Sequence, residues 1–222
     1  MKVEADMLGL QDLQIVLTPG LNRGGLSEDF IAQQLSNCVM MSLPGPHAFL
    51  VFVRIGHSDY QDVGRQMDAI KEVFGTEFIN HTMVVFTGAD VLKQDGRNIE
   101  DFVERLEGDF KEFMKECKNR YVAFDNQIIW GSDKKKPSLQ DRLDNVKQSR
   151  DLIDSVMKMV DENDRSLYSD DLYKAAGQIA EDCKSADDKE RMEMVMASTE
   201  MESVRGKVRR LGAKSNNSCV IL

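Results

Sequence analysis

The chain has 222 residues, of which 41% are hydrophobic and 30% charged, and its formal net charge is −9. This composition fits one globular domain with an extension and excludes a strongly basic nucleic-acid-binding protein. The sequence contains no signal peptide and no run of about 18 apolar residues, so we expect a cytoplasmic protein without a membrane-spanning helix. Its four cysteines stand far apart, without a CxxC pair, which predicts a reducing compartment and no metal site: Cys38, Cys117, Cys183 and Cys219.

Apolar runs alternate with segments of helical periodicity over the first 130 residues. Runs rich in β-branched and aromatic residues predict strands over 13–17, 48–53, 82–87 and 121–124. Apolar residues at helical spacing predict one helix from Val63 to Phe74, with Gly75 as its C-cap, and another from Phe102 to Cys117. This alternation predicts an α/β fold with a doubly wound, mainly parallel sheet.

The pattern changes after Trp130. A charged linker (134–137) and a capping Ser138 precede an amphipathic helix over 139–160, and Ser169 is the expected cap of a second helix over 172–183. We expect these two helices to pair and pack on the sheet domain, because the heptad pattern is short and interrupted. The chain therefore divides into 1–132 (sheet domain), 133–200 (helical extension) and 201–222 (basic tail).

Three polar turns follow predicted strands. Thr18-Pro19-Gly20 could bring a backbone N–H close to a phosphate, although taken alone it is better explained as a plain Pro-Gly turn. Thr87-Gly88-Ala89-Asp90 offers a carboxylate that can accept two hydrogen bonds from a guanine edge, and its alternative role is a helix cap. Asn126 ends a segment that begins at Asn119 and otherwise reads as an Asx turn. Each signal is weak alone, but the three occur at successive strand ends.

Several segments together resemble the AIG-type GTPases, the GIMAP/IAN family of immunity-associated nucleotide-binding proteins. Residues 17–21 (LTPGL) resemble the family's D-T-P-G-L, and residues 44–50 (PGPHAFL) match its most specific marker. Residues 85–90 resemble its F-T-x-x-D guanine motif, and 119–126 its N-R-Y-x-x-F-N-N motif. The M-V-x-x-N…Y…Y pattern of the family's helical extension follows from Met159. The resemblance implies a G-domain-like fold, GTP/GDP and magnesium as cofactors, GTPase activity and nucleotide-dependent self-association to a homo-oligomer.

The departures from the family pattern bear on that activity. No segment of the sequence reads G-x-x-x-x-G-K-[ST], the loop that binds phosphates and magnesium. Leu17 stands where the family has an Asp that helps to organise magnesium, and Val91 replaces a second acid of the guanine motif. We therefore expect an incomplete G-domain-like sheet, impaired nucleotide binding and no catalytic residue. The strand ending at Leu17 should lack its neighbour on the side facing the strand near Ala48, unless another segment takes that place.

Two minor features have structural explanations. His47 precedes a predicted core strand and is expected to be a structural histidine rather than a base. The methionines of 192–201 are spaced irregularly and are expected to form an adaptable packing surface.

The last four residues, Cys219-Val220-Ile221-Leu222, form a C-a-a-X box whose terminal Leu favours geranylgeranylation of Cys219. Five basic residues precede it without an intervening acid, and they would add attraction to an anionic membrane: Arg205, Lys207, Arg209, Arg210 and Lys214. A disordered basic tail is the alternative. The sequence thus supports a GTP-binding protein attached to the cytosolic face of a membrane, or a nucleotide-free, lipid-anchored interaction module.

Overall fold

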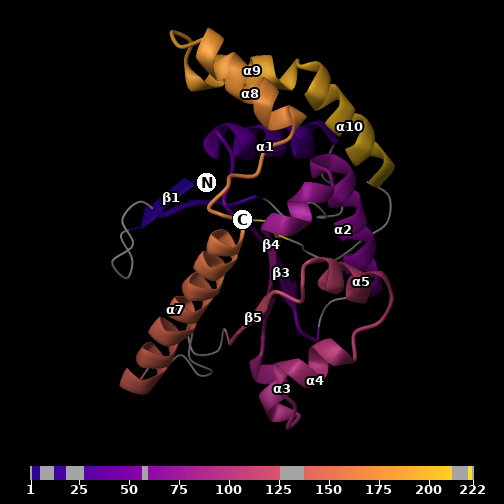
Figure 1. The fold of residues 1–222 in the computed structure, drawn as a ribbon, viewed down its shortest axis with the longest axis vertical. Helices are drawn as coiled ribbons and strands as arrows, with labels where there is room; N and C mark the ends of the chain where they lie inside the picture. Colours follow the sequence, from indigo (N-terminus) through magenta and orange to yellow (C-terminus); the bar gives the residue numbers. More distant parts are fainter. Residues whose placement is uncertain are drawn as a thin grey trace.

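A computed structural model describes residues 2–5, 13–18, 28–56, 60–125, 138–211 and 220–221 (Figure 1). The strands in chain order are β1 (Lys2–Ala5), β2 (Leu13–Val16), β3 (Phe49–Arg54), β4 (Thr82–Thr87), β5 (Tyr121–Phe124) and β6 (Val220–Ile221). The helices are α1 (Glu28–Met41), α2 (Tyr60–Phe74), the 3-10 helix η1 (Thr76–His81), α3 (Asp90–Gln94), α4 (Ile99–Glu104), α5 (Gly108–Glu116), α7 (Leu139–Glu162), α8 (Asp171–Asp182), α9 (Asp188–Met196) and α10 (Thr199–Leu211).

The larger sheet has the strand order β5-β4-β3-β6. β3 pairs in parallel with β4, and β4 in parallel with β5, which confirms the predicted parallel sheet. β4 is buried along almost its whole length, as expected for a strand covered on both faces. Figure 1 shows α2 and α5 on one side of this sheet and α7 on the other, so the sheet is doubly wound.

The main sheet is incomplete on the side of β3 that faces away from β4. β2 pairs with β1 in a separate two-stranded antiparallel sheet and has no pairing with β3. The outer edge of β3 instead pairs with β6, in antiparallel register, at Val51 and Phe52. Among the described residues, no strand lies between β2 and the outer edge of β3, and a two-residue segment from the other end of the sequence satisfies part of that edge.

The helical extension differs from the expected two-helix pair. α7 lies along β5, whereas α8 packs with α1, α9 and α10 in a separate layer (Figure 1). α10 continues to Leu211 and buries Met201 and Val204, so a helix occupies much of the region expected to be a basic tail. The expected Ser169 cap is wrong by one residue, because the Asp170 carboxylate accepts the hydrogen bond from Tyr173 N at 2.9 Å.

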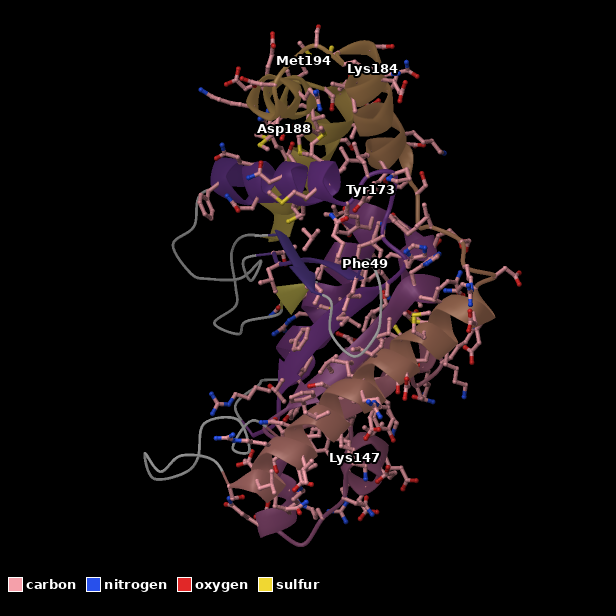
Figure 2. All side chains as sticks on the ribbon, turned by 90° about the vertical axis from the view of Figure 1, so that its left-hand side faces the viewer. Phe49, Lys147, Tyr173, Lys184, Asp188 and Met194 are labelled. Carbon is pink, nitrogen blue, oxygen red and sulfur yellow. The ribbon has the colours of Figure 1, made fainter. Side chains whose placement is uncertain are left out.

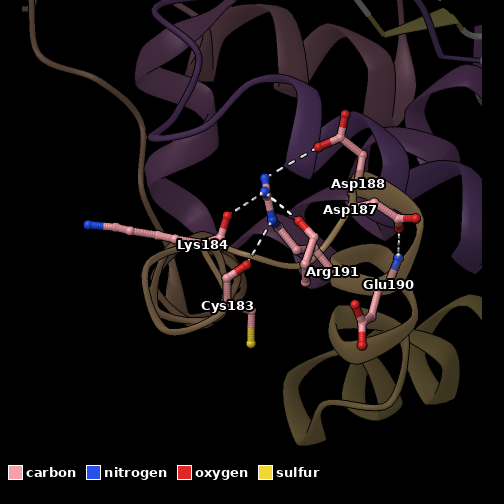
Figure 3. Close-up of polar contacts among 7 residues, drawn as sticks. Cys183, Lys184, Asp187, Asp188, Glu190 and Arg191 are labelled. Atoms are coloured by element: carbon pink, nitrogen blue, oxygen red, sulfur yellow. Dashed lines mark hydrogen bonds and ion pairs between the residues drawn. The ribbon is translucent and has the colours of Figure 1, made fainter.

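Arg191 fixes the corner between α8 and α9 (Figure 3). Its guanidinium donates to the carbonyls of Cys183 (3.2 Å) and Ala186 (2.6 Å), which lie just beyond the last residue of α8. A cation at this position satisfies carbonyls that have no intrahelical partner and opposes the negative end of the helix dipole. The Asp187 side chain caps α9 by accepting a hydrogen bond from Glu190 N at 2.8 Å. Side-chain hydrogen bonds therefore stabilise both the end of α8 and the start of α9.

The Pro-Gly-Pro segment (44–46) joins the sheet domain to the extension. Tyr168 N donates to Pro46 O at 2.9 Å, and a Cβ added at Gly45 would lie 1.9 Å from Tyr168 O. No side chain fits at that distance, so only glycine permits this approach. Tyr168 is almost fully buried, and its ring lies 5.0 Å from that of Phe49 at the start of β3. The most specific family marker therefore packs the start of β3 against Tyr168 of the extension.

One predicted helix is divided in two. The expected helix from Phe102 to Cys117 consists of α4 and α5, separated by residues 105–107, and Gly108, the first residue of α5, adopts φ 66°. Leu106, inside the break, is buried with Phe110 and Phe113. The apolar periodicity continues across the break because both short helices face the same core.

Burial makes two of the cysteines poor nucleophiles. It raises the pKa of Cys38 to about 11 and that of Cys117 to about 12, so almost none of either thiol is ionised at neutral pH. At pH 7.5 we expect both to react with a thiol reagent at least about 100-fold more slowly in the folded protein than in guanidinium chloride. Half-buried Cys183 is the internal comparison and should react first of the three. Rapid native-state labelling of Cys117, assigned by peptide mass spectrometry, would contradict this packing.

Candidate functional site

Three strand ends lie level with one another at the carboxyl edge of the parallel sheet. Arg54, Thr87 and Phe124 are direct partners in the register of β3, β4 and β5. Backbone hydrogen bonds continue past the strands, from Ile55 N to Thr87 O (2.9 Å) and from Ala89 N to Phe124 O (3.2 Å). The segments that follow β3, β4 and β5 are therefore held side by side, at the edge where parallel α/β sheets bind ligands.

Asp90 is placed on this edge by a turn that requires glycine. Gly88 adopts φ 77°, in the left-handed region, and reverses the chain between β4 and α3. Asp90 begins α3 and is half-buried, and the helix has no side-chain cap from the preceding Ala89. A carboxylate at this position can accept hydrogen bonds from a ligand lying against the edge.

Asp125 follows β5 and is engaged within the protein. Its carboxylate is 3.0 Å from Lys93 Nζ on α3, and its backbone N–H donates to Gln148 Oε1 on α7 at 2.7 Å. Asp125 itself is 7% exposed, so its charge is compensated rather than solvated. These contacts connect the α3 segment that carries Asp90 with the segment leading to Asn126, and the sequence predicted neither Lys93 nor Gln148.

The structure describes only some of the other predicted site residues. Thr87 is half-buried at the end of β4, in the row described above. Thr18 follows β2 in the separate sheet, so strand pairing does not bring it to Thr87 and Asp90. Pro19, Gly20, Asn126 and Cys219 lie outside the described residues.

The described residues do not fit a magnesium centre. Among them, no three His, Cys, Asp or Glu side chains are close enough together to bind a metal ion. Leu17, at the position of the family's acid, has no oxygen in its side chain to offer as a ligand. No magnesium step is therefore part of the proposed function.

His47 is exposed, and the histidine that packs in the core near β3 is His81. The His47 side chain is exposed just before β3, and its carbonyl lies 3.1 Å from His81 Nδ1. His81 is the buried histidine, and its ring packs 5.9 Å from that of Tyr168. The histidine that supports the core near β3 is thus His81.

Arg120 of the Asn-Arg-Tyr motif binds three main-chain carbonyls. Its guanidinium donates to the carbonyls of Cys117 (2.9 Å), Asn80 (2.8 Å) and Ile79 (2.8 Å), which terminate α5 and lie in η1. Asn163, after α7, donates to the same Asn80 carbonyl at 2.8 Å. This part of the motif therefore positions β5 and the extension and does not contact the candidate site.

We expect Arg120→Met to destabilise the fold by about 2–3 kcal/mol, because it leaves three partly buried carbonyls without their charged donor. Urea unfolding followed by circular dichroism measures this change. Arg97→Met is the matched control, since Arg97 is exposed and pairs only locally with Asp95, and it should cost less than about 0.5 kcal/mol. If the two substitutions lowered the free energy of unfolding equally, Arg120 would not have the stabilising role described here.

A parallel sheet whose strand ends place Thr87, Asp90 and Asp125 on one edge defines a parallel α/β domain, the class of fold whose ligands bind at that edge. Residues 2–187 match the AIG1 family, which covers most of the chain. The chain belongs to the AIG1 family.

Curated relatives from Arabidopsis thaliana agree with this assignment. The chain is 30% identical to Immune-associated nucleotide-binding protein 8 over 162 residues, which are 72% of this chain and 43% of the relative. It is 28% identical to Immune-associated nucleotide-binding protein 9 over 164 residues, 72% of this chain and 44% of the relative. With number 4 of the same series it shares 23% identity over 170 residues, 76% of this chain and 49% of the relative. The chain thus spans less than half the length of each of these three proteins.

Proposed function

We propose that this chain is a guanine-nucleotide-binding protein of the AIG type that recognises the base at the edge formed after β4 and β5. The observation that carries the proposal is the level row of Arg54, Thr87 and Phe124, with Asp90 immediately beyond it at the start of α3. Family membership and the names of the relatives support nucleotide binding as the shared activity. The Asp90 carboxylate would accept two hydrogen bonds from the N–H groups of the guanine edge, a pair that adenine does not offer.

The phosphates would be bound weakly. In this superfamily, backbone amides and a Lys of the G-x-x-x-x-G-K-[ST] loop bind them, and the sequence given contains no such loop. The Thr18–Gly20 turn is the one remaining phosphate contact suggested by the sequence. Base recognition without these charge-assisted contacts gives low affinity, because each contributes more than a neutral hydrogen bond.

We further propose that the protein is attached to the cytosolic face of a membrane by a geranylgeranyl group on Cys219, a modification that requires β6 (Val220–Ile221) to leave the edge of β3. In the described ranges, no helix is long and apolar enough to cross a bilayer. Of the basic residues that would assist, Arg205 lies on α10, is partly buried and pairs with Glu202 at 3.1 Å, so it contributes less than the sequence suggested. The remaining attraction is assigned to Lys207, Arg209, Arg210 and Lys214.

Isothermal titration with GTP and GDP tests the nucleotide proposal. We expect a Kd weaker than about 100 μM, that is, less than about 5.5 kcal/mol of binding free energy, and weaker binding of ATP. A Kd of about 1 μM or tighter would show that the phosphates are bound by groups that we have not identified.

A second candidate function is a nucleotide-free, lipid-anchored interaction module. It is favoured by the engagement of the buried Asp125 carboxylate with Lys93. This candidate predicts that even about 1 mM GTP gives no heat of binding and no change in thermal stability, while membrane attachment persists.

A further inference from the structure

The last strand of the main sheet is formed by the C-a-a-X box itself. β6 consists of Val220 and Ile221, the two aliphatic residues of the box, and its backbone pairs in antiparallel register with Phe52 and Val51 of β3. Cys219, the residue that would carry the lipid, directly precedes Val220 in the sequence. The proposed lipidation site is therefore adjacent to a strand that is docked on the sheet.

β3, on which β6 docks, has the character of an interior strand. Val51 and Val53 are 0% and 2% exposed, and Phe49, which Figure 2 labels in the middle of the molecule, is 4% exposed. β4 pairs with one edge of β3 along all 6 residues, whereas β6 pairs with the other edge at two positions, Val51 and Phe52. The backbone groups on an open strand edge need hydrogen-bond partners. The C-terminal strand therefore docks on an edge that favours the pairing of a further strand.

We propose that this docking sequesters the C-a-a-X box, so that release of β6 from β3 controls membrane attachment. The inference rests on the lipid anchor proposed above. In the transfer, the Cys219 thiolate attacks the allylic carbon of geranylgeranyl diphosphate: a C–S bond forms, the C–O bond breaks, diphosphate leaves with the bonding electrons, and the thiol proton passes to water. The transferase recognises the cysteine together with the residues that follow it, so a box whose backbone is paired with β3 is not available to the enzyme.

The short length of β6 makes its docking reversible. Its two paired residues form few hydrogen bonds, each of which stabilises the docked state only modestly. Ordering the end of the chain costs conformational entropy of a similar size. The docked and released states are therefore close in free energy, and a small change at the edge of β3 shifts the balance between them. The released state is the one that accepts the lipid.

Initial rates of geranylgeranyl transfer by the purified transferase test the proposal. We expect kcat/KM to be at least about 10-fold higher for a synthetic peptide of residues 213–222 than for the full chain, which corresponds to a box released in about one chain in ten. Phe52→Lys should raise the value for the full chain at least about 5-fold, because a charge on the docking edge opposes strand pairing. Val122→Lys is the matched control: Val122 is also half-buried, but it lies on β5, at the other edge of the sheet, so the rate should change less than about 2-fold.

Nuclear magnetic resonance tests the docking without the transferase. Deleting residues 219–222, which leaves the core intact, should shift the backbone amide signals of Val51 and Phe52 and leave those of Val122 and Ala123 on β5 in place. Unmoved signals of Val51 and Phe52, equal rates for the peptide and the full chain, or a folded Phe52→Lys variant with an unchanged rate would overturn the sequestration and leave the lipid anchor standing. A peptide that the transferase does not modify would instead overturn the lipid anchor, and the sequestration with it.

Discussion

Cys219→Ser is expected to move the protein from the membrane pellet to the soluble fraction and to lower the pelleted share roughly tenfold or more. In the proposed function the thioether at Cys219 is the covalent link to the lipid, and serine cannot form it. Cys183→Ser is the matched control, because Cys183 is half-buried next to Met194 and plays no part in attachment. An inhibitor of geranylgeranyl transfer should reproduce the Cys219→Ser result, and an inhibitor of farnesyl transfer should do so less.

The basic residues should modulate this attachment unequally. Neutralising Lys207, Arg209, Arg210 and Lys214 together should weaken membrane retention and make the remainder less sensitive to salt. Arg205→Gln alone should have a small effect, since Arg205 already pairs with Glu202. A wild-type protein that is soluble and carries an unmodified C-terminal peptide by mass spectrometry would contradict the lipid anchor.

The main sheet was predictable because its strands are continuous apolar runs. β3, β4 and β5 lie within one residue of their expected positions, and their parallel order follows from the alternation with helices. α1 was missed, although Leu35 and Val39 have helical spacing and are buried. The helical nature of α10 was hidden by its charge, since the basic residues dominate a segment in which Met201 and Val204 are buried. The break between α4 and α5 was not predicted because both helices bury the same apolar face.

The candidate site was predictable in part for a geometric reason. Strands that are parallel and adjacent must end on the same edge, so Thr87 and Asp90 could be assigned to it from strand order alone. The engagement of Asp125 could not, because its partners Lys93 and Gln148 are 32 and 23 residues away along the chain. Likewise, the Asn-Arg-Tyr motif resembled a base-contact signature, but Arg120 contacts carbonyls that only the folded chain brings together.

Asp90→Asn is expected to change the base preference from guanine toward xanthine. The guanine edge presents two N–H donors that a carboxylate accepts, whereas an amide offers one acceptor and one donor and therefore matches xanthine better. Exchanging a satisfied buried pair for a mismatched one costs about 1–3 kcal/mol, which corresponds to roughly 5- to 150-fold in the ratio of the two affinities. Asp95→Asn is a suitable control, since Asp95 is an exposed residue that pairs with Arg97.

Nuclear magnetic resonance titration of the chain with millimolar GTP, XTP and ATP tests the proposed base site most directly, because it detects weak binding and locates it. We expect GTP to shift the backbone amide signals of Thr87, Gly88, Asp90 and Asp125, which lie at one edge of the sheet, while ATP leaves them nearly unchanged. In the Asp90→Asn variant, XTP should shift the same signals more than GTP does. Equal responses to GTP and ATP, or shifts confined to residues away from this edge, would contradict guanine recognition at the ends of β4 and β5.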